Sequence, residues 1–149
     1  MADGEGRTPG AMTLDDAVAH VTSTDLRFAV TTATVRGVRY KVFENVPSTV
    51  PALLRASWTA QDEGRAEYLV YEKERWTFSE FCGDVQRISQ GLSSEYGIGK
   101  GDRVAIAMRN YPELLILVMA ISSLGAVVVF VNAWWTTEEL EYALRDSAP

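Results

Sequence analysis

An uncharged run of 18 residues, from Leu114 to Val131, limits the possible folds of this chain more than any other feature of its sequence (LLILVMAISSLGAVVVFV). As one continuous helix the run would be about 27 Å long at 1.5 Å per residue, slightly less than the roughly 30 Å hydrocarbon layer of a bilayer. The flanking charges are compatible with a membrane span, because Lys100, Arg103 and Arg109 precede the run and glutamates follow it. Length and charge therefore leave a membrane span open.

The order of residue types inside the run favours two buried elements. Ser122, Ser123 and Gly125 interrupt it, and the β-branched residues that follow Gly125 prefer strands. We expect a helix over residues 114–124 that starts near Pro112, a break at Gly125, and a strand over residues 127–131. One unbroken helix across Gly125 would contradict this interpretation.

A second apolar run, VAIAM at residues 104–108, begins 23 residues before VVVFV. That spacing is enough for a strand, a crossover helix and a parallel strand, so the sequence predicts one parallel βαβ unit. Both runs are continuously apolar, which predicts strands buried on both faces. A small integral membrane protein is the lesser alternative.

Other elements follow from capping and turn signals. Three Thr–Asp or Thr–Glu pairs predict helix starts: Thr13 with Asp16, Thr77 with Glu80, and Thr136 with Glu139. The helix after Thr77 should end at Gly97, and another helix should begin near Pro51. The alternating segments predict two hairpins, one turning at Gly37 and one turning at Lys73 and Glu74.

The composition narrows the class of protein. With 149 residues, 47% hydrophobic and 23% charged, the chain is typical of a globular domain. A net charge of −6 disfavours nonspecific binding to nucleic acid or anionic membranes. The single cysteine, Cys82, excludes an internal disulfide and favours a cytoplasmic location, and the single histidine, His20, leaves no material for a His/Cys metal cluster or a Cys–His nucleophile.

Local signals assign no catalytic, cofactor-binding or metal-binding residue. Lys100 lies in GIGKGD, but Gly101 follows it, and the loop leaves a helix C-terminus to enter a strand, so it does not form a phosphate loop. Trp134 and Trp135 follow a strand, where they could line a pocket or pack against the sheet edge, and we favour packing. The glutamates at 138, 139 and 141 are interpreted as a solvated helix start.

Residues 76–149 resemble the early part of the AMP-forming acyl-CoA synthetase family of adenylate-forming enzymes. The matching features are Trp76-Thr77, Gly97, the segment Gly99-Lys100-Gly101-Asp102-Arg103-Val104, Asn110, Pro112-Glu113, Gly125-Ala126, Val131-Asn132, Glu138-Glu139-Leu140 and Asp146-Ser147. The segment NAWWTTEEL is most similar to fatty-acyl-CoA ligases. The resemblance implies formation of an acyl-adenylate from a carboxylic acid and ATP, with Mg²⁺, and then transfer of the acyl group to coenzyme A. The family's nucleotide loop, ribose-binding acid and catalytic lysine are expected after Pro149, so none is carried over to this chain.

These inferences predict an α/β fold: an incomplete parallel sheet with flanking helices, preceded by a helix and β-hairpins. Residues 1–12 are expected to be a flexible tail, 13–62 a helix and hairpin segment, and 63–149 the first βα units of a truncated large adenylate-forming domain. The expected function is that of the N-terminal part of an acid:CoA ligase, inactive alone, and whether this chain is itself an enzyme stays open. The alternative is a noncatalytic interaction module or split subunit, whose uncovered sheet edge binds the remainder of the fold or forms a homo-oligomer.

Overall fold

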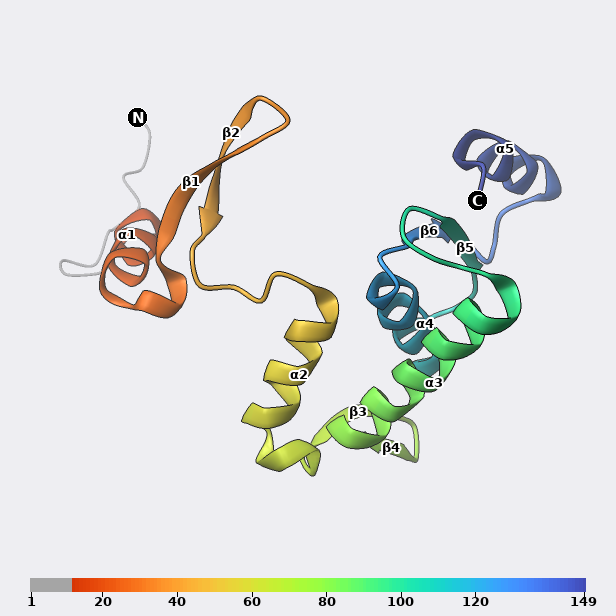
Figure 1. The fold of residues 1–149 in the computed structure, drawn as a ribbon, viewed down its shortest axis with the longest axis horizontal. Coiled ribbons are helices and arrows are strands. Elements are labelled where there is room, and N and C mark those ends of the chain that lie inside the picture. The colour runs from red at the N-terminus through yellow and green to blue at the C-terminus, as the bar shows by residue number, and fades with distance from the viewer. Residues whose placement is uncertain (1–11) are drawn as a thin grey trace, which may run out of the picture. The chain divides into compact units, whose positions relative to one another are not determined.

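The computed structural model describes residues 12–149, in two compact units that comprise Met1–Val46 and Pro47–Pro149 (Figure 1). Of the predicted tail, residues 1–11 lie outside the described part of the chain. The boundaries expected near residues 12 and 62 come from sequence patterns, whereas the two units are separated by the contacts within each of them. These boundaries therefore stay predictions. The α/β class is confirmed.

Within residues 12–46, the first unit contains an α-helix, a 3₁₀ helix and one hairpin. Its elements are α1 (Leu14–Thr24), the 3₁₀ helix η1 (Leu26–Phe28), β1 (Val30–Val35) and β2 (Val38–Phe43). The strands are antiparallel, with Val35 opposite Val38 and Val30 opposite Phe43. None of residues 12–46 is buried, so the described part of this unit has no core of its own.

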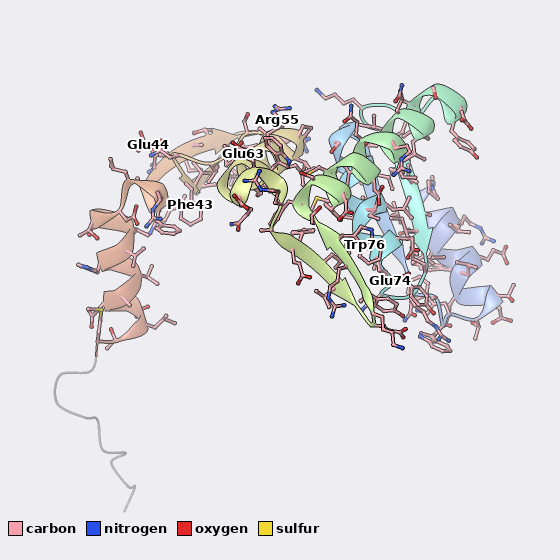
Figure 2. The ribbon with its side chains drawn as sticks, turned by 90° about the horizontal axis from the view of Figure 1, so that it is seen from below. Phe43, Glu44, Arg55, Glu63, Glu74 and Trp76 are labelled. Carbon is pink, nitrogen blue, oxygen red and sulfur yellow. The ribbon has the colours of Figure 1, made fainter. Side chains whose placement is uncertain are left out.

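The second unit carries the remaining helices and strands. They are α2 (Val50–Ala60), η2 (Asp62–Gly64), β3 (Glu67–Tyr71), β4 (Glu74–Thr77), α3 (Phe78–Tyr96), β5 (Arg103–Ala107), α4 (Pro112–Ser123), β6 (Val127–Val131) and α5 (Thr137–Ser147). Strands β3 and β4 form an antiparallel hairpin, and Trp76 and Glu74 project from β4 (Figure 2). The predicted turn is wrong by one residue: Glu74 pairs with Tyr71, so the turn consists of Glu72 and Lys73.

The apolar run is divided as its residue types predict. Helix α4 ends at Ser123, and Gly125 has φ +74°, a left-handed conformation in which a side chain is strained. The Gly125 N–H donates to the Ser122 carbonyl at 3.0 Å, and its own carbonyl accepts from the Gly101 N–H at 3.0 Å. None of the helices within residues 12–149 combines the length and apolar character that a bilayer crossing requires.

Strands β5 and β6 pair in parallel, which confirms the βαβ unit, with Arg103 opposite Val127 and Ala107 opposite Val131. The expectation that both strands are buried on both faces is wrong for this part of the chain. Val127 and Phe130 are 48% and 62% exposed. Helix α4 packs against one face of the pair, and α5 makes only limited contact with β6, so side chains directed elsewhere stay uncovered within residues 12–149.

Helix α4 joins two buried clusters, which explains why it is apolar on nearly every side. One cluster places Ile116 and Ala120 of α4 against Phe81 and Val85 of α3. The other places Ile121 of α4 beside the strands, together with Ile106 and Ala126. Because the helix is buried from two directions, its sequence has no solvent stripe.

All three predicted capping boxes are present. In each, the threonine hydroxyl accepts a hydrogen bond from a backbone N–H three residues on, and the acidic side chain accepts from the threonine N–H. Hydrogen bonds from the backbone and hydroxyl of Thr77 lower the pKa of Glu80, and those of Thr136 lower the pKa of Glu139 in the same way. Helix α3 ends at Gly97, as predicted.

Candidate functional site

A hollow of about 530 Å³ lies where β5 and β6 end. Its walls come from the segment after β5, which carries Arg109 and Asn110, and from the segment after β6, which carries Asn132, Trp134 and Trp135. The carboxyl ends of parallel strands meet at one edge of a sheet, so the residues that follow them converge although they are distant in sequence. Fold topology thus makes this edge the candidate site.

Local hydrogen bonds hold the β6 side of the hollow. The Asn132 side-chain oxygen accepts a hydrogen bond from the Trp134 N–H at 3.0 Å, and the Asn132 carbonyl accepts from the Trp135 N–H at 3.2 Å. An asparagine that binds backbone two residues further on forms a compact turn. This turn places the Trp134 ring next to the end of β5.

Arg109 completes the hollow from the β5 side. Its guanidinium carbon lies 3.9 Å from the centre of the Trp134 ring, a cation–π contact. No carboxylate within residues 12–149 makes an ion pair with Arg109, so its hydrogen-bond donors are available to another anion. The site therefore combines one positive charge, two amide side chains and aromatic surface, which suits a ligand with an anionic group and an apolar part.

The structure corrects the packing expected of the two tryptophans. Trp134 is 71% exposed and Trp135 is 40% exposed, so neither is packed under neighbouring loops in the described chain. Trp134 stacks on the Arg109 guanidinium at the carboxyl ends of β5 and β6, and that contact leaves most of the Trp134 side chain exposed to solvent. The sequence placed both residues at the end of a strand but contained no signal that Arg109 would contact one of them.

The other residues that the sequence offered as candidates for a site do not line this hollow. Lys100 precedes β5 at the opposite end of the strands, where its side chain lies beside Gly125. Glu139 caps α5, and Glu141 forms an ion pair with Arg145. His20 is exposed on α1. Among the residues that the structure describes, no three His, Cys, Asp or Glu side chains are grouped so that they could hold a metal ion.

A second hollow, of about 390 Å³, lies between α2, α3 and α4 and contains Cys82. Burial raises the pKa of the Cys82 thiol, which disfavours the reactive thiolate. Nearby, the Trp58 indole N–H donates to the Ser79 hydroxyl at 2.8 Å, and the Ser89 hydroxyl donates to the Ala120 carbonyl at 3.0 Å. These contacts join the three helices that surround the hollow.

Comparison with known proteins gives the fold and site their family. The family model of AMP-binding enzymes matches residues 56–149. The medium-chain acyl-CoA ligase ACSF2, mitochondrial, of Danio rerio is 30% identical over 139 residues, which cover 93% of this chain and 22% of that protein. The chain belongs to the AMP-binding enzyme family, and within it the chain is similar to the N-terminal portion of acyl-CoA ligases, as its sequence predicted.

Solved structures agree with this assignment. The N-terminal domain of FACL13 from Mycobacterium tuberculosis is 30% identical with a TM-score of 0.61, over 67% of this chain and 25% of that chain. The O-succinylbenzoate coenzyme A synthetase of Bacillus subtilis, solved with ATP and magnesium ion, is 29% identical with a TM-score of 0.58, over 63% of this chain and 25% of that chain. The chain thus spans about an eighth to a quarter of the length of the proteins that it matches.

Proposed function

We propose that this chain forms the N-terminal part of an ATP-dependent, AMP-forming acid:CoA ligase of the fatty-acyl type, which activates a carboxylic acid through an acyl-adenylate. The observation that carries the proposal is the family match over residues 56–149, which contains the whole βαβ unit and the hollow at its carboxyl end. The similarity to the Danio rerio medium-chain ligase extends over 93% of the chain and supports the fatty-acyl type.

The chain's own residues supply scaffold and one binding surface in this proposal. Helix α4 and strands β5 and β6 form a rigid support, and Arg109, Asn132 and Trp134 offer donors and an aromatic face to an anionic substrate. Residues 12–149 have no grouped carboxylates for Mg²⁺, and the glycine-rich loop at Lys100 adjoins the C-terminal end of α3, where the helix dipole disfavours phosphate. We therefore assign no step of adenylation to these residues, and we expect residues 1–149 alone to be inactive.

Two assays test the proposal together. Purified residues 1–149 should give no ATP–pyrophosphate exchange with any fatty or aromatic acid. A chimaera in which residues 56–149 replace the matching segment of the Danio rerio ligase should keep ATP-dependent acyl-CoA formation. Exchange by the isolated chain would overturn the assignment of inactivity. A folded chimaera that binds no substrate and forms no acyl-CoA would overturn the proposed function.

The same chimaera tests the hollow. Arg109→Ala or Trp134→Ala should raise KM for an anionic substrate by roughly 5-fold to 30-fold, the size of a lost contact of about 1–2 kcal/mol. Arg87→Ala is the matched control, because Arg87 pairs with Asp84 on α3 and takes no part in the hollow. Equal effects of the Arg109 and Arg87 changes would remove the hollow from substrate binding.

We also place the activity in the cytosol, because the single cysteine gives no sign of an oxidising compartment. Cell fractionation of the tagged protein should recover it with cytosolic markers. Recovery with mitochondria, the location that the name of the Danio rerio relative gives, would contradict this placement.

A further inference from the structure

The hairpin of the first unit lies outside the part of the chain that the family model matches, which begins at residue 56. It also lacks what a hairpin needs to be stable. A two-stranded hairpin is marginal in water unless further strands or a helix cover its apolar face. Here Val35, Val38 and Tyr40, which lie on one face, are each 51–52% exposed. Something beyond the hairpin itself must complete this sheet.

The register identifies which backbone groups are free. Arg36 and Gly37 form a two-residue turn, both with positive φ, so Val35 and Val38 form a hydrogen-bonded pair. Hydrogen-bonded pairs alternate along the two strands, so Ala29 and Glu44 should form another such pair. The Ala29 carbonyl does accept a hydrogen bond from the Glu44 N–H at 2.8 Å, and Glu44 follows Phe43 at the end of β2 (Figure 2). The odd-numbered residues of β1 therefore bond to β2. The N–H and C=O groups of Val30, Thr32 and Thr34 point away from it.

The two outer edges of the hairpin differ in charge. Between Ala29 and Phe43 there are three cationic residues and no acidic residue, and two of the cations, Arg39 and Lys41, lie on β2. Charged side chains, above all lysine, protect a strand edge from pairing. Strand β1 has the sequence VTTATV, which is uncharged, contains no proline and is rich in β-branched residues. The open edge of the hairpin is therefore β1.

We propose that β1 pairs antiparallel with β1 of a second copy of this chain, around a two-fold axis at Thr32. In this register Thr32 lies opposite its own counterpart and Val30 lies opposite Thr34, so the three outward-facing residues of each copy pair with one another in about six hydrogen bonds. Thr–Thr pairs directly across strands are favourable. The sequence is thus self-complementary at the edge of this hairpin that lacks protecting charges.

Spacing and charge are compatible with this dimer. The two β2 strands become the outer strands of a four-stranded sheet, roughly 14 Å apart at about 4.8 Å per strand, which is beyond the Debye length of about 8–10 Å at physiological salt. Repulsion between their Arg39 and Lys41 side chains is therefore largely screened. Pairing through β2 would instead bring these cations within one strand spacing of each other.

Amide hydrogen exchange on the 149-residue chain, together with its molar mass from light scattering, tests the proposal. We expect a dimer, with protection at the amides of Thr31, Ala33 and Val35 from the hairpin and at Val30, Thr32 and Thr34 from the partner strand. Dilution to monomer should abolish protection of the second set and weaken that of the first set, because a lone hairpin is only marginally stable. A chain that is monomeric at about 200 μM, or a dimer with unprotected Thr32, would overturn the proposal.

Thr32→Pro is the decisive variant, because it removes an outward N–H and leaves the bonds between β1 and β2 intact. It should raise the dimer dissociation constant by at least about 30-fold, while Thr32→Val, which keeps the N–H, should leave the constant within about 3-fold of the original. Protection at Ala33 in the proline variant shows that the hairpin is still folded. A dimer that survives Thr32→Pro would show that another surface holds the two copies together, and the proposal would fail.

Discussion

The break at Gly125 decides between a buried βαβ unit and a membrane span, and one substitution tests it. In Gly125→Ala the alanine must keep the φ of +74° that the glycine has. Its new Cβ would lie 3.3 Å from Cγ of Lys100. A left-handed conformation costs an L-residue about 1–2 kcal/mol, and the flexible lysine stem can move by the few tenths of an ångström that relieve the contact. We therefore expect a loss of about 1–2 kcal/mol in the free energy of unfolding, or roughly 2–8 °C in Tm for a chain of this size.

Two other glycines provide matched controls. Gly97 has φ +70° with nothing within 4 Å of an added Cβ, so Gly97→Ala should show the conformational cost without the lysine contact. Gly83 lies inside α3 with open space around it, so Gly83→Ala should stabilise the chain by about 0.5–1 kcal/mol through helix propensity. Urea unfolding followed by circular dichroism measures all three variants.

If Gly125→Ala were as stable as the parent, or more stable, while Gly97→Ala was destabilised, residue 125 could not have a left-handed conformation. The apolar run would then continue as one helix, and the parallel strand pair would be lost with it.

Three further predictions concern the core, a cap and the cysteine. Ile121 is fully buried, so Ile121→Ala should cost about 2–5 kcal/mol and Ile121→Val about 0.5–1.5 kcal/mol in urea unfolding, and equal costs would contradict its place in the core. The folded state lowers the pKa of Glu80, so this carboxylate stabilises the fold above the usual glutamate pKa and the stabilisation is lost as pH falls; Glu80→Gln should flatten the acid side of a plot of Tm against pH, and an unchanged slope would contradict the cap. Because burial raises the pKa of Cys82, its thiol should react with a disulfide reagent more slowly in the folded than in the urea-unfolded chain, and equal rates would contradict its burial.

The candidate site shows where sequence reasoning reached its limit. The tryptophans at 134 and 135 could be placed at the end of a strand, because strand and turn signals are local. Their exposure and the Arg109–Trp134 contact could not be predicted, because the partners lie 25 positions apart in the sequence and only the parallel pairing of β5 and β6 brings them together. The expected burial of both strand faces failed for the same reason, since burial depends on which helices reach each face.

The family resemblance of residues 76–149 could be recognised in the amino-acid sequence alone, and so could several local elements: the three Thr-based caps, the end of α3 at Gly97 and the break at Gly125. Each of these local elements depends on interactions among residues a few positions apart, whose free energies are similar wherever the segment lies. Three features could be known only from the three-dimensional fold: α4 is buried from two sides, Arg109 contacts Trp134, and the outer edge of β1 is unpaired within residues 12–149. Those features arise from contacts between segments that are distant in sequence. Such contacts contribute to stability only when the fold brings the segments together, so no local pattern reports them.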